Sequence, residues 1–196
     1  MKPEPVPALI RSFIAIPLTV PVYSAIDEIQ SRLRRSLSDV RWTRPDTLHL
    51  TLHFFGNISE ESLDKAAACM VSIESLFSPF SLLFSGLGAF PAPDRARIFW
   101  LGVHSPPLAK LHRALTERLG DCGFEIEQRP FRPHITLGRS RGGPQNAGHI
   151  LSEKRDMVVG EMTVDRLVLF ESELLPTGAR HRPRHTIHFT ADCNRQ

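Results

Sequence analysis

The sequence of 196 residues predicts an α+β fold built on antiparallel sheet. Strand-like and helix-like segments are mixed along the chain, and some neighbouring strands have no helix between them. A doubly wound parallel sheet needs a crossover helix at each of those places, whereas antiparallel strands do not. The glycine-rich phosphate loops of many parallel α/β folds are also missing, because neither G-x-x-x-x-G-K nor G-x-G-x-x-G occurs.

The first half of the chain begins with a proline-rich tail, residues 1–9, and continues with alternating strand and helix patterns. Strands are expected at residues 11–17 and 48–55, and helices at residues 20–37 and 59–73. Pro17 closes the first strand. Ser59 is expected to be the N-cap of the second helix, since Glu60 and Glu61 follow it in the first turn, where negative charge suits the helix dipole.

The second half predicts more strand than helix. Strands are expected at residues 80–84, 96–103, 131–139, 162–170 and 185–190, and a helix at residues 105–120. Ser105 and Pro106 have the residue types of an N-cap and first helical position, and Gly120 is expected to end that helix. Residues 140–148 are polar and rich in glycine, so an exposed loop is expected there.

The composition is that of a soluble protein with an ordinary core. Apolar residues make up 41% of the chain and charged residues 23%, enough for one domain or for two small lobes that share a core. The net charge of +3 is compatible with an anionic ligand but does not by itself indicate nucleic-acid binding. Three cysteines without a C-x-x-C pair indicate neither a disulfide framework nor a structural zinc site.

The sequence also predicts where in the cell the protein is located. No segment reads as a signal peptide, and none approaches the roughly 18 apolar residues of a membrane span. We therefore expect a cytoplasmic protein without membrane contact. A monomer is expected, because no coiled-coil heptads or long exposed apolar strand suggests assembly.

A short histidine motif occurs once in each half of the chain. Residues 45–52 and residues 132–137 both read His–aliphatic–Thr–Leu after a proline. A third His-x-Thr at residues 188–190 lacks the proline and the aliphatic flanks, and it fits the wet face of an ordinary strand. The two flanked copies in comparable settings point to a shared role.

Strand geometry explains the spacing within the motif. Alternate side chains of a strand share a face. His49 and Thr51 should therefore lie on one face together with His53, and His134 should share a face with Thr136. The aliphatic residues between them should be buried, so each strand presents an imidazole and a hydroxyl on its open face.

The chemistry of phosphate transfer gives a reason for two copies. Opening a cyclic phosphodiester in line needs a base on one side of phosphorus and an acid on the other. Imidazole titrates near neutral pH, so one histidine can be neutral while another is protonated. Threonine hydroxyls beside each imidazole can donate to the non-bridging phosphate oxygens. Four groups from two strands would then surround one phosphate.

The paired H-x-T-x motifs resemble those of the two-histidine (2H) phosphoesterase superfamily. Within it, the chain is most similar to the RNA 2′,3′-cyclic phosphodiesterases, also called 2′-5′ RNA ligases. The similar segments are residues 11–17, Trp42 followed by residues 48–56, residues 97–103 and residues 129–139. The resemblance extends from Arg11 to about His188.

The resemblance implies a fold and a reaction. The fold is a single bilobal α+β domain over residues 1–196, with an antiparallel sheet and outer helices in each lobe, one motif per lobe and a central cleft. The reaction is hydrolysis of an RNA 2′,3′-cyclic phosphate end to a 2′-phosphomonoester, without metal or other cofactor. His49 would be the proton donor to O3′ and His134 the proton acceptor from water, although the two motifs are nearly equivalent. Thr51 and Thr136 would bind the phosphate.

Further candidates for substrate binding are basic or aromatic. Arg139 adjoins the second motif, and Arg97 begins the middle strand of the resemblance. Near the C-terminus the family often has a small-residue turn followed by Arg-Tyr, and here the matching residues are Arg180 and His181. His181 therefore stands where tyrosine is common, which leaves the substrate preference open.

Other functions remain open at this stage. The chain could be an RNA-end binding module without catalysis, although both motifs are intact. It could also be a 2H enzyme for a small cyclic nucleotide or for an ADP-ribose cyclic phosphate. Metal catalysis is disfavoured, because His181, His185 and His188 lack an accompanying carboxylate and zinc-site spacing. His49 and His53 would lie about 13 Å apart on a strand, too far to share one ion.

Overall fold

The computed structural model describes residues 8–176 and 178–190. Most of the expected N-terminal tail, residues 1–7, lies outside the described residues. Within the described ranges, none of the helices has both the length and the apolar character that a membrane span requires.

The described residues form nine strands and four α-helices. In chain order they are β1 (Ile10–Pro17), α1 (Val20–Arg34), β2 (Val40–Trp42), β3 (His49–Ile58), α2 (Glu60–Val71), β4 (Phe80–Phe90), β5 (Ile98–His104), α3 (Pro106–Asp121), β6 (His134–Ser140), α4 (Gly148–Ser152), β7 (Val158–Val164), β8 (Arg166–Leu175) and β9 (Gly178–His188). Short 3₁₀ turns stand at Pro45–Thr47, Glu74–Leu76 and Pro93–Arg95.

The three long helices lie where their apolar periodicity predicts them. Ser59 caps α2 as expected, because its hydroxyl accepts from the backbone N–H of Ser62 at 3.2 Å. Ser105 occupies the N-cap position of α3, but its side chain accepts no capping hydrogen bond. All the leucines of the α3 stripe are fully buried, and they are Leu108, Leu111, Leu115 and Leu119.

Several strands differ from the expectation. The strand predicted at residues 162–170 is wrong, because β7 ends at Val164 and β8 begins at Arg166. The break falls at Asp165, where the chain leaves the pairing with β4 and enters the pairing with β1, and neither glycine nor proline marks it in the sequence. The three-residue strand β2 is too short to show alternation. β4 continues through glycines that resemble a loop, and Gly88 is needed because a Cβ there would lie 2.1 Å from the ring of Trp100.

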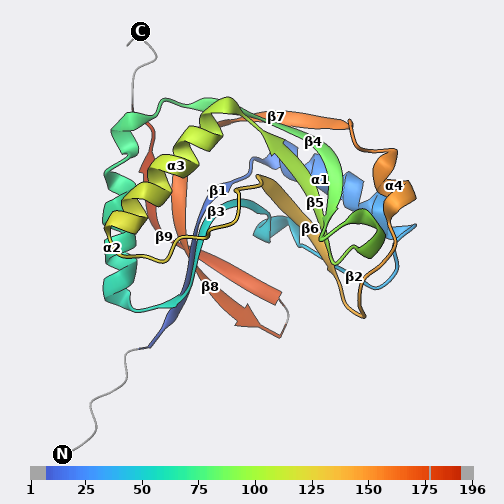
Figure 1. The fold of residues 1–196 in the computed structure, drawn as a ribbon, viewed down its shortest axis with the longest axis horizontal. Helices are drawn as coiled ribbons and strands as arrows, with labels where there is room; N and C mark the ends of the chain where they lie inside the picture. Colours follow the sequence, from blue (N-terminus) through green and yellow to red (C-terminus); the bar gives the residue numbers. More distant parts are fainter. Residues whose placement is uncertain (1–7, 177, 191–196) are drawn as a thin grey trace, which may run out of the picture.

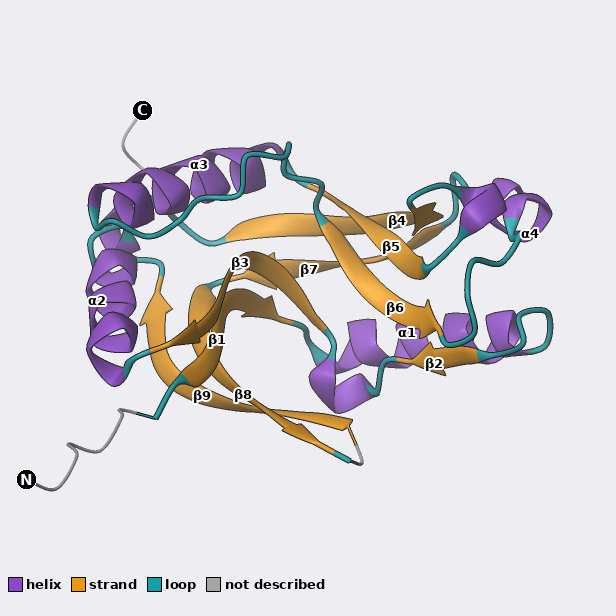
Figure 2. Ribbon diagram, turned by 60° about the horizontal axis from the view of Figure 1, so that its bottom comes forward, coloured by secondary structure: helices purple, strands orange, loops and turns teal. Residues whose placement is uncertain are grey.

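All the strands pair antiparallel in the order β7-β4-β5-β6-β3-β1-β8-β9, with β2 on the free part of β6. The predicted α+β class with antiparallel sheet is confirmed. The two expected sheets correspond to the halves β7-β4-β5-β6 and β3-β1-β8-β9. They are joined into one curled sheet at a single pair of residues, Leu50 and Ile135 (Figures 1 and 2).

The helices tie the halves together. α1 follows β1 but contacts β7, on the other half of the sheet, and its Gln30 bonds to Leu137 of β6 (Figure 2). α3 follows β5 but packs against α2, which contacts β8 and β9. The thiols of Cys69 in α2 and Cys122 after α3 are in contact, and both are free. One cluster of buried apolar side chains includes residues of both halves.

Both motif strands contain a β-bulge directly after the motif threonine. On β3, Thr51 pairs with Ala15 and His53 with Ile14, so that Leu52 is the extra residue. On β6, Thr136 pairs with Trp100 and Gly138 with Phe99, which leaves Leu137 as the extra residue. A bulge locally disrupts the ladder hydrogen bonds, so the carbonyl of the extra residue needs donors outside the regular pairing, and for Leu137 the backbone N–H of Thr43 is one of them, at 2.8 Å.

Polar side chains of the crossing helices also donate to these carbonyls. The buried amide of Gln30 in α1 donates through Nε2 to the carbonyls of Leu137 and Thr43, at 2.9 Å each. A ring N–H of His112 in α3 donates to the backbone carbonyl of Leu52. Each bulge is thus supported by the helix that crosses over from the other half of the sheet.

The bulges also shift the alternation of side chains. His53 pairs with the core residue Ile14 and is only 7% exposed, whereas Phe54 pairs with Phe13 and is 48% exposed. The expectation that His53 shares the face of His49 is therefore wrong. The extra residue at position 52 turns His53 toward the core, and sequence alternation alone does not reveal a bulge.

The amide of Gln30 is expected to stabilise the fold. In Gln30→Met the carbonyl of Thr43 loses this buried donor, and the carbonyl of Leu137 keeps only the N–H of Thr43. We expect the free energy of unfolding in urea to fall by about 1–3 kcal/mol. The control Gln128→Met removes an exposed amide and should change it by less than about 0.5 kcal/mol. Equal stability of Gln30→Met and wild type would contradict this role.

Candidate active site

The two motif strands lie side by side and antiparallel. Leu50 stands opposite Ile135, and both side chains are fully buried in the core that the helices cover. Their chain neighbours point to the opposite, uncovered face of the sheet. The neighbours are the four motif side chains: His49, Thr51, His134 and Thr136.

Antiparallel register crosses the two motifs. One step to either side of the Leu50–Ile135 pair directs His49 toward Thr136 and His134 toward Thr51. The histidines are then diagonal neighbours, and in regular pairing such positions are about 7–8 Å apart. That separation leaves room for one phosphate between two imidazoles. Each motif histidine therefore lies opposite the threonine of the other motif, and the four side chains form one group.

The imidazoles are held in the same way. Nδ1 of His49 bonds to the carbonyl of Thr47 at 2.8 Å, and Nδ1 of His134 bonds to the carbonyl of Arg132 at 2.7 Å. A carbonyl oxygen only accepts, so Nδ1 carries a hydrogen in both rings. Each Nε2 remains available for substrate, as a base when the ring is neutral and as an acid when it is protonated.

Aromatic rings fix the orientation of each imidazole. The ring of Phe13 stacks on His49 with centroids 4.5 Å apart, and His181 meets His49 edge to face at 5.2 Å. The ring of Phe90 meets His134 edge to face at 5.1 Å. Sequence reasoning did not single out Phe13 or Phe90, because an aromatic residue in a strand gives no sign of which ring it will contact.

Burial sets the protonation state of both histidines. It lowers the pKa of His49 to about 4, a shift that the Thr47 carbonyl opposes and the nearby His181 increases. Burial also lowers the pKa of His134, where the bond to Arg132 opposes the shift and the charge of Arg139 adds to it. Both imidazoles are therefore neutral at pH 7 before an anion binds.

Arg139 reaches the site because of the bulge in its strand. The extra residue Leu137 shifts the alternation, so Arg139 comes onto the face of His134, whose pKa it affects. Arg97 lies one residue before β5, where its carbonyl accepts from the N–H of Ser140. Both guanidinium groups are exposed.

His181 and Arg180 are adjacent on β9 but have different surroundings. His181 contacts the rings of His49 and Phe13, and its Nδ1 is buried without a hydrogen-bond partner. An imidazole thus supplies the aromatic surface at the position where the family often has tyrosine. Arg180 points to the other face of the strand and pairs with Glu173 at 2.8 Å, so the structure does not bring it into the histidine cluster.

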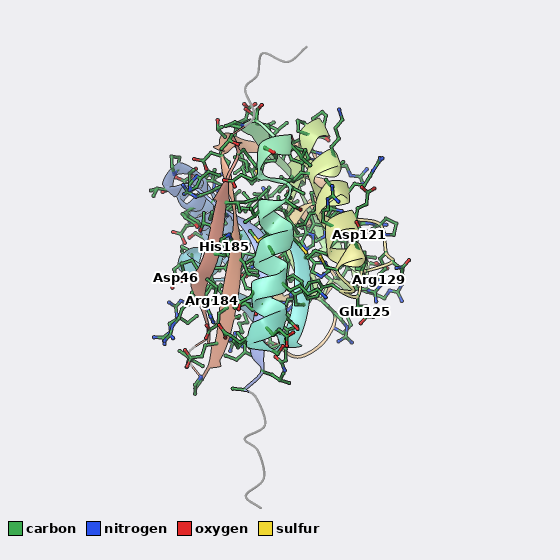
Figure 3. All side chains as sticks on the ribbon, turned by 90° about the vertical axis from the view of Figure 1, so that its left-hand side faces the viewer. Asp46, Asp121, Glu125, Arg129, Arg184 and His185 are labelled. Atoms are coloured by element: carbon green, nitrogen blue, oxygen red, sulfur yellow. The ribbon has the colours of Figure 1, made fainter. Side chains whose placement is uncertain are left out.

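Other arginines near the motifs are also ion-paired. Arg184 on β9 binds Glu60 of α2 and Glu171 of β8, and Arg129 lies 3.6 Å from Glu127. Figure 3 shows Arg184 and His185 on one side of α2 and Arg129 on the other side, beyond the end of α3. These ion pairs lie at the protein surface. Among the described residues, no group of three His, Cys, Asp or Glu side chains is placed to hold a metal ion.

Comparison with known proteins identifies the family. The family model described as the 2′-5′ RNA ligase superfamily matches residues 21–174, which include both motifs. The chain belongs to this superfamily. The expected 2H phosphoesterase family and enzyme class are thereby confirmed.

Named relatives agree with this family membership. An RNA 2′,3′-cyclic phosphodiesterase of Methanothermobacter thermautotrophicus is 33% identical over 86% of this chain and 93% of its own length. One of Thermotoga maritima is 32% identical over 91% of this chain and 95% of its own length.

Solved structures of similar proteins have the same fold. A Thermus thermophilus protein superposes with a TM-score of 0.80 at 26% identity, over 93% of this chain and 99% of that chain. Apo LigT of E. coli gives a TM-score of 0.76 at 26% identity, with the same coverage. LigT complexed with 3′-AMP gives 0.73 at 26% identity, also with that coverage.

Proposed function

We propose that this superfamily member hydrolyses RNA 2′,3′-cyclic phosphate ends to 2′-phosphomonoesters. The observation that carries the proposal is the crossed register of the two motifs, which puts two equivalently held imidazoles on one open face of the sheet. The names of the relatives, RNA 2′,3′-cyclic phosphodiesterases, support the choice of substrate. Because each half contributes one motif, we propose that residues 1–196 act as one bilobal unit. We also propose that the protein is a cytoplasmic monomer.

The reaction is a single in-line displacement at phosphorus. His134 takes a proton from water as the water oxygen attacks, and the bond between phosphorus and O3′ breaks. His49 donates a proton to O3′, so the product has a free 3′-hydroxyl and a 2′-phosphate. The hydroxyls of Thr51 and Thr136 donate to the non-bridging oxygens, where charge increases in the transition state. No step uses a metal.

The protonation states of His49 and His134 depend on the substrate. In the free protein both imidazoles are neutral at pH 7, whereas the reaction needs one protonated ring. A phosphate anion between the two rings favours the protonated form of each, because opposite charges a few ångströms apart stabilise one another. Substrate binding therefore raises the pKa values and supplies the acid. The assignment of His49 as donor and His134 as acceptor follows the family resemblance.

The first test removes each imidazole in the presence of EDTA. Wild type should convert an RNA with a 2′,3′-cyclic phosphate end to the 2′-phosphate, identified by ³¹P NMR. His49→Ala and His134→Ala should each lose about 10²–10⁴-fold in kcat, because each removes a general acid or base. The control His149→Ala changes an exposed histidine and should keep full activity.

Three outcomes of this test decide between the functions. Loss of wild-type turnover in EDTA, or its survival in both motif variants, would contradict the metal-free two-histidine mechanism. Binding of the RNA end without turnover would favour the non-catalytic module. Faster turnover of 2′,3′-cyclic AMP than of RNA would favour a small cyclic nucleotide as substrate.

The second test is the pH dependence of kcat/KM, which reports groups of the free enzyme. Activity falls on the acid side when the base becomes protonated, and on the alkaline side when the acid loses its proton. Both pKa values lie below the ordinary value of about 6.5 for histidine. The bell should therefore peak below about pH 6.5, with one limb at about 4.

The profile of kcat should lie at higher pH, because the bound anion raises both pKa values. The exposed-histidine variant His149→Gln should reproduce the wild-type profile. A kcat/KM bell centred above pH 7, or a profile with only one limb, is not compatible with two buried histidines as acid and base.

A further inference from the structure

The short strand β2 carries an arginine that sequence reasoning did not consider. Arg41 stands directly opposite Arg139 in the antiparallel pairing of β2 with β6. Paired residues of neighbouring strands project from the same face of a sheet. Arg41 is therefore on the same face as Arg139, which the bulge at Leu137 turns toward His134.

The pair has no carboxylate to balance it. The described residues give neither Arg41 nor Arg139 an acidic partner within ion-pair distance, whereas Arg44, Arg180 and Arg184 each have one. Like charges directly opposite each other destabilise a sheet. An exposed pair of guanidinium groups without counter-charge is, in contrast, a good site for an anion such as a phosphate.

Arg41 also reaches toward the other half of the sheet. Its Nη2 lies 3.8 Å from the position that a Cβ would take on Gly178, the first residue of β9. His181, which contacts His49, follows on the same strand. The guanidinium group of Arg41 thus lies between β2 and the start of β9, at the end of the open face beyond Arg139.

The position distinguishes this site from the catalytic phosphate site. The motif side chains lie on β3 and β6, and β2 pairs with the same edge of β6 as β3 but three to five residues further along, so Arg139 lies roughly 10 Å beyond Thr136. An anion held by both Arg41 and Arg139 is therefore a second anion, beside the one between the histidines. RNA has one phosphate per nucleotide, so a chain whose end is in the site presents its next phosphate nearby.

We infer that Arg41, together with Arg139, binds the internal phosphodiester that precedes the terminal cyclic phosphate, and that Arg41 thereby selects RNA chains over cyclic mononucleotides. The inference rests on the proposed function for its terminal site. It adds a substrate class, a 3′-terminal dinucleotide or longer, and a residue that recognises it.

The test compares substrates that differ by one charge. They are 2′,3′-cyclic AMP, the dinucleotide ApA with a 2′,3′-cyclic phosphate end, and the same dinucleotide with an uncharged methylphosphonate linkage. For wild type, kcat/KM should be highest for the dinucleotide with the charged linkage. In Arg41→Gln the ratio of kcat/KM for that dinucleotide over 2′,3′-cyclic AMP should fall about tenfold or more, since a charge-assisted hydrogen bond is lost.

Further variants separate this role from a structural one. Arg41→Lys keeps the charge and should recover part of the ratio. The control Arg113→Gln removes an exposed arginine of α3 and should leave the ratio as in wild type. The methylphosphonate dinucleotide should show no selective loss in Arg41→Gln, because its linkage has no charge for the arginine to bind.

A binding measurement makes the result independent of turnover. Fluorescence anisotropy with a labelled ApA that ends in a 2′-phosphate should show weaker binding and a shallower salt dependence in Arg41→Gln, by roughly one counterion. If wild type hydrolyses neither cyclic substrate, the proposed function fails, and this measurement still decides the role of Arg41. If Arg41→Gln leaves both the kcat/KM ratio and the binding of the labelled dinucleotide unchanged, the inference is overturned. Equal losses of kcat/KM on 2′,3′-cyclic AMP and on the dinucleotide with the charged linkage would overturn it too.

Discussion

The pairing of Leu50 with Ile135 is the constraint on which the site depends. It is the one register position at which β3 meets β6, and it joins the two halves of the sheet. Since both side chains are buried, the residues next to them in sequence must face the open side. The same antiparallel contact that closes the core therefore brings two motifs, far apart in the chain, onto one surface.

The two halves are related by more than the motif residues. Each motif histidine bonds through Nδ1 to the carbonyl two residues before it, and each motif is followed by a bulge. The bulged carbonyls accept from Gln30 and His112, which belong to helices that cross over from the opposite half. Buried polar groups need partners, so these bonds fix how the helices sit on the sheet as well as the shape of the strands.

Much of this arrangement is predictable from the sequence, and the reasons for the failures are physical. The helices follow from apolar spacing, and the motif pair with its open face follows from strand alternation. The bulges are not predictable, because an extra residue changes a register without changing the local pattern. Alternation alone therefore puts His53 on the wrong face, and it does not place Arg139 on the face of His134. Arg41 could not be found before β2 was known, since a strand of three residues has no period to detect.

We propose that the two motifs together hold one phosphate. NMR of the imidazole nitrogens during titration with adenosine 2′-phosphate tests this, with assignments from His49→Ala and His134→Ala. His49 and His134 should respond along one binding curve with one ligand per chain, and the pKa of each should rise in the complex. The exposed His149 should not respond. A response of only one of the two, or two separate binding curves, would contradict a shared site.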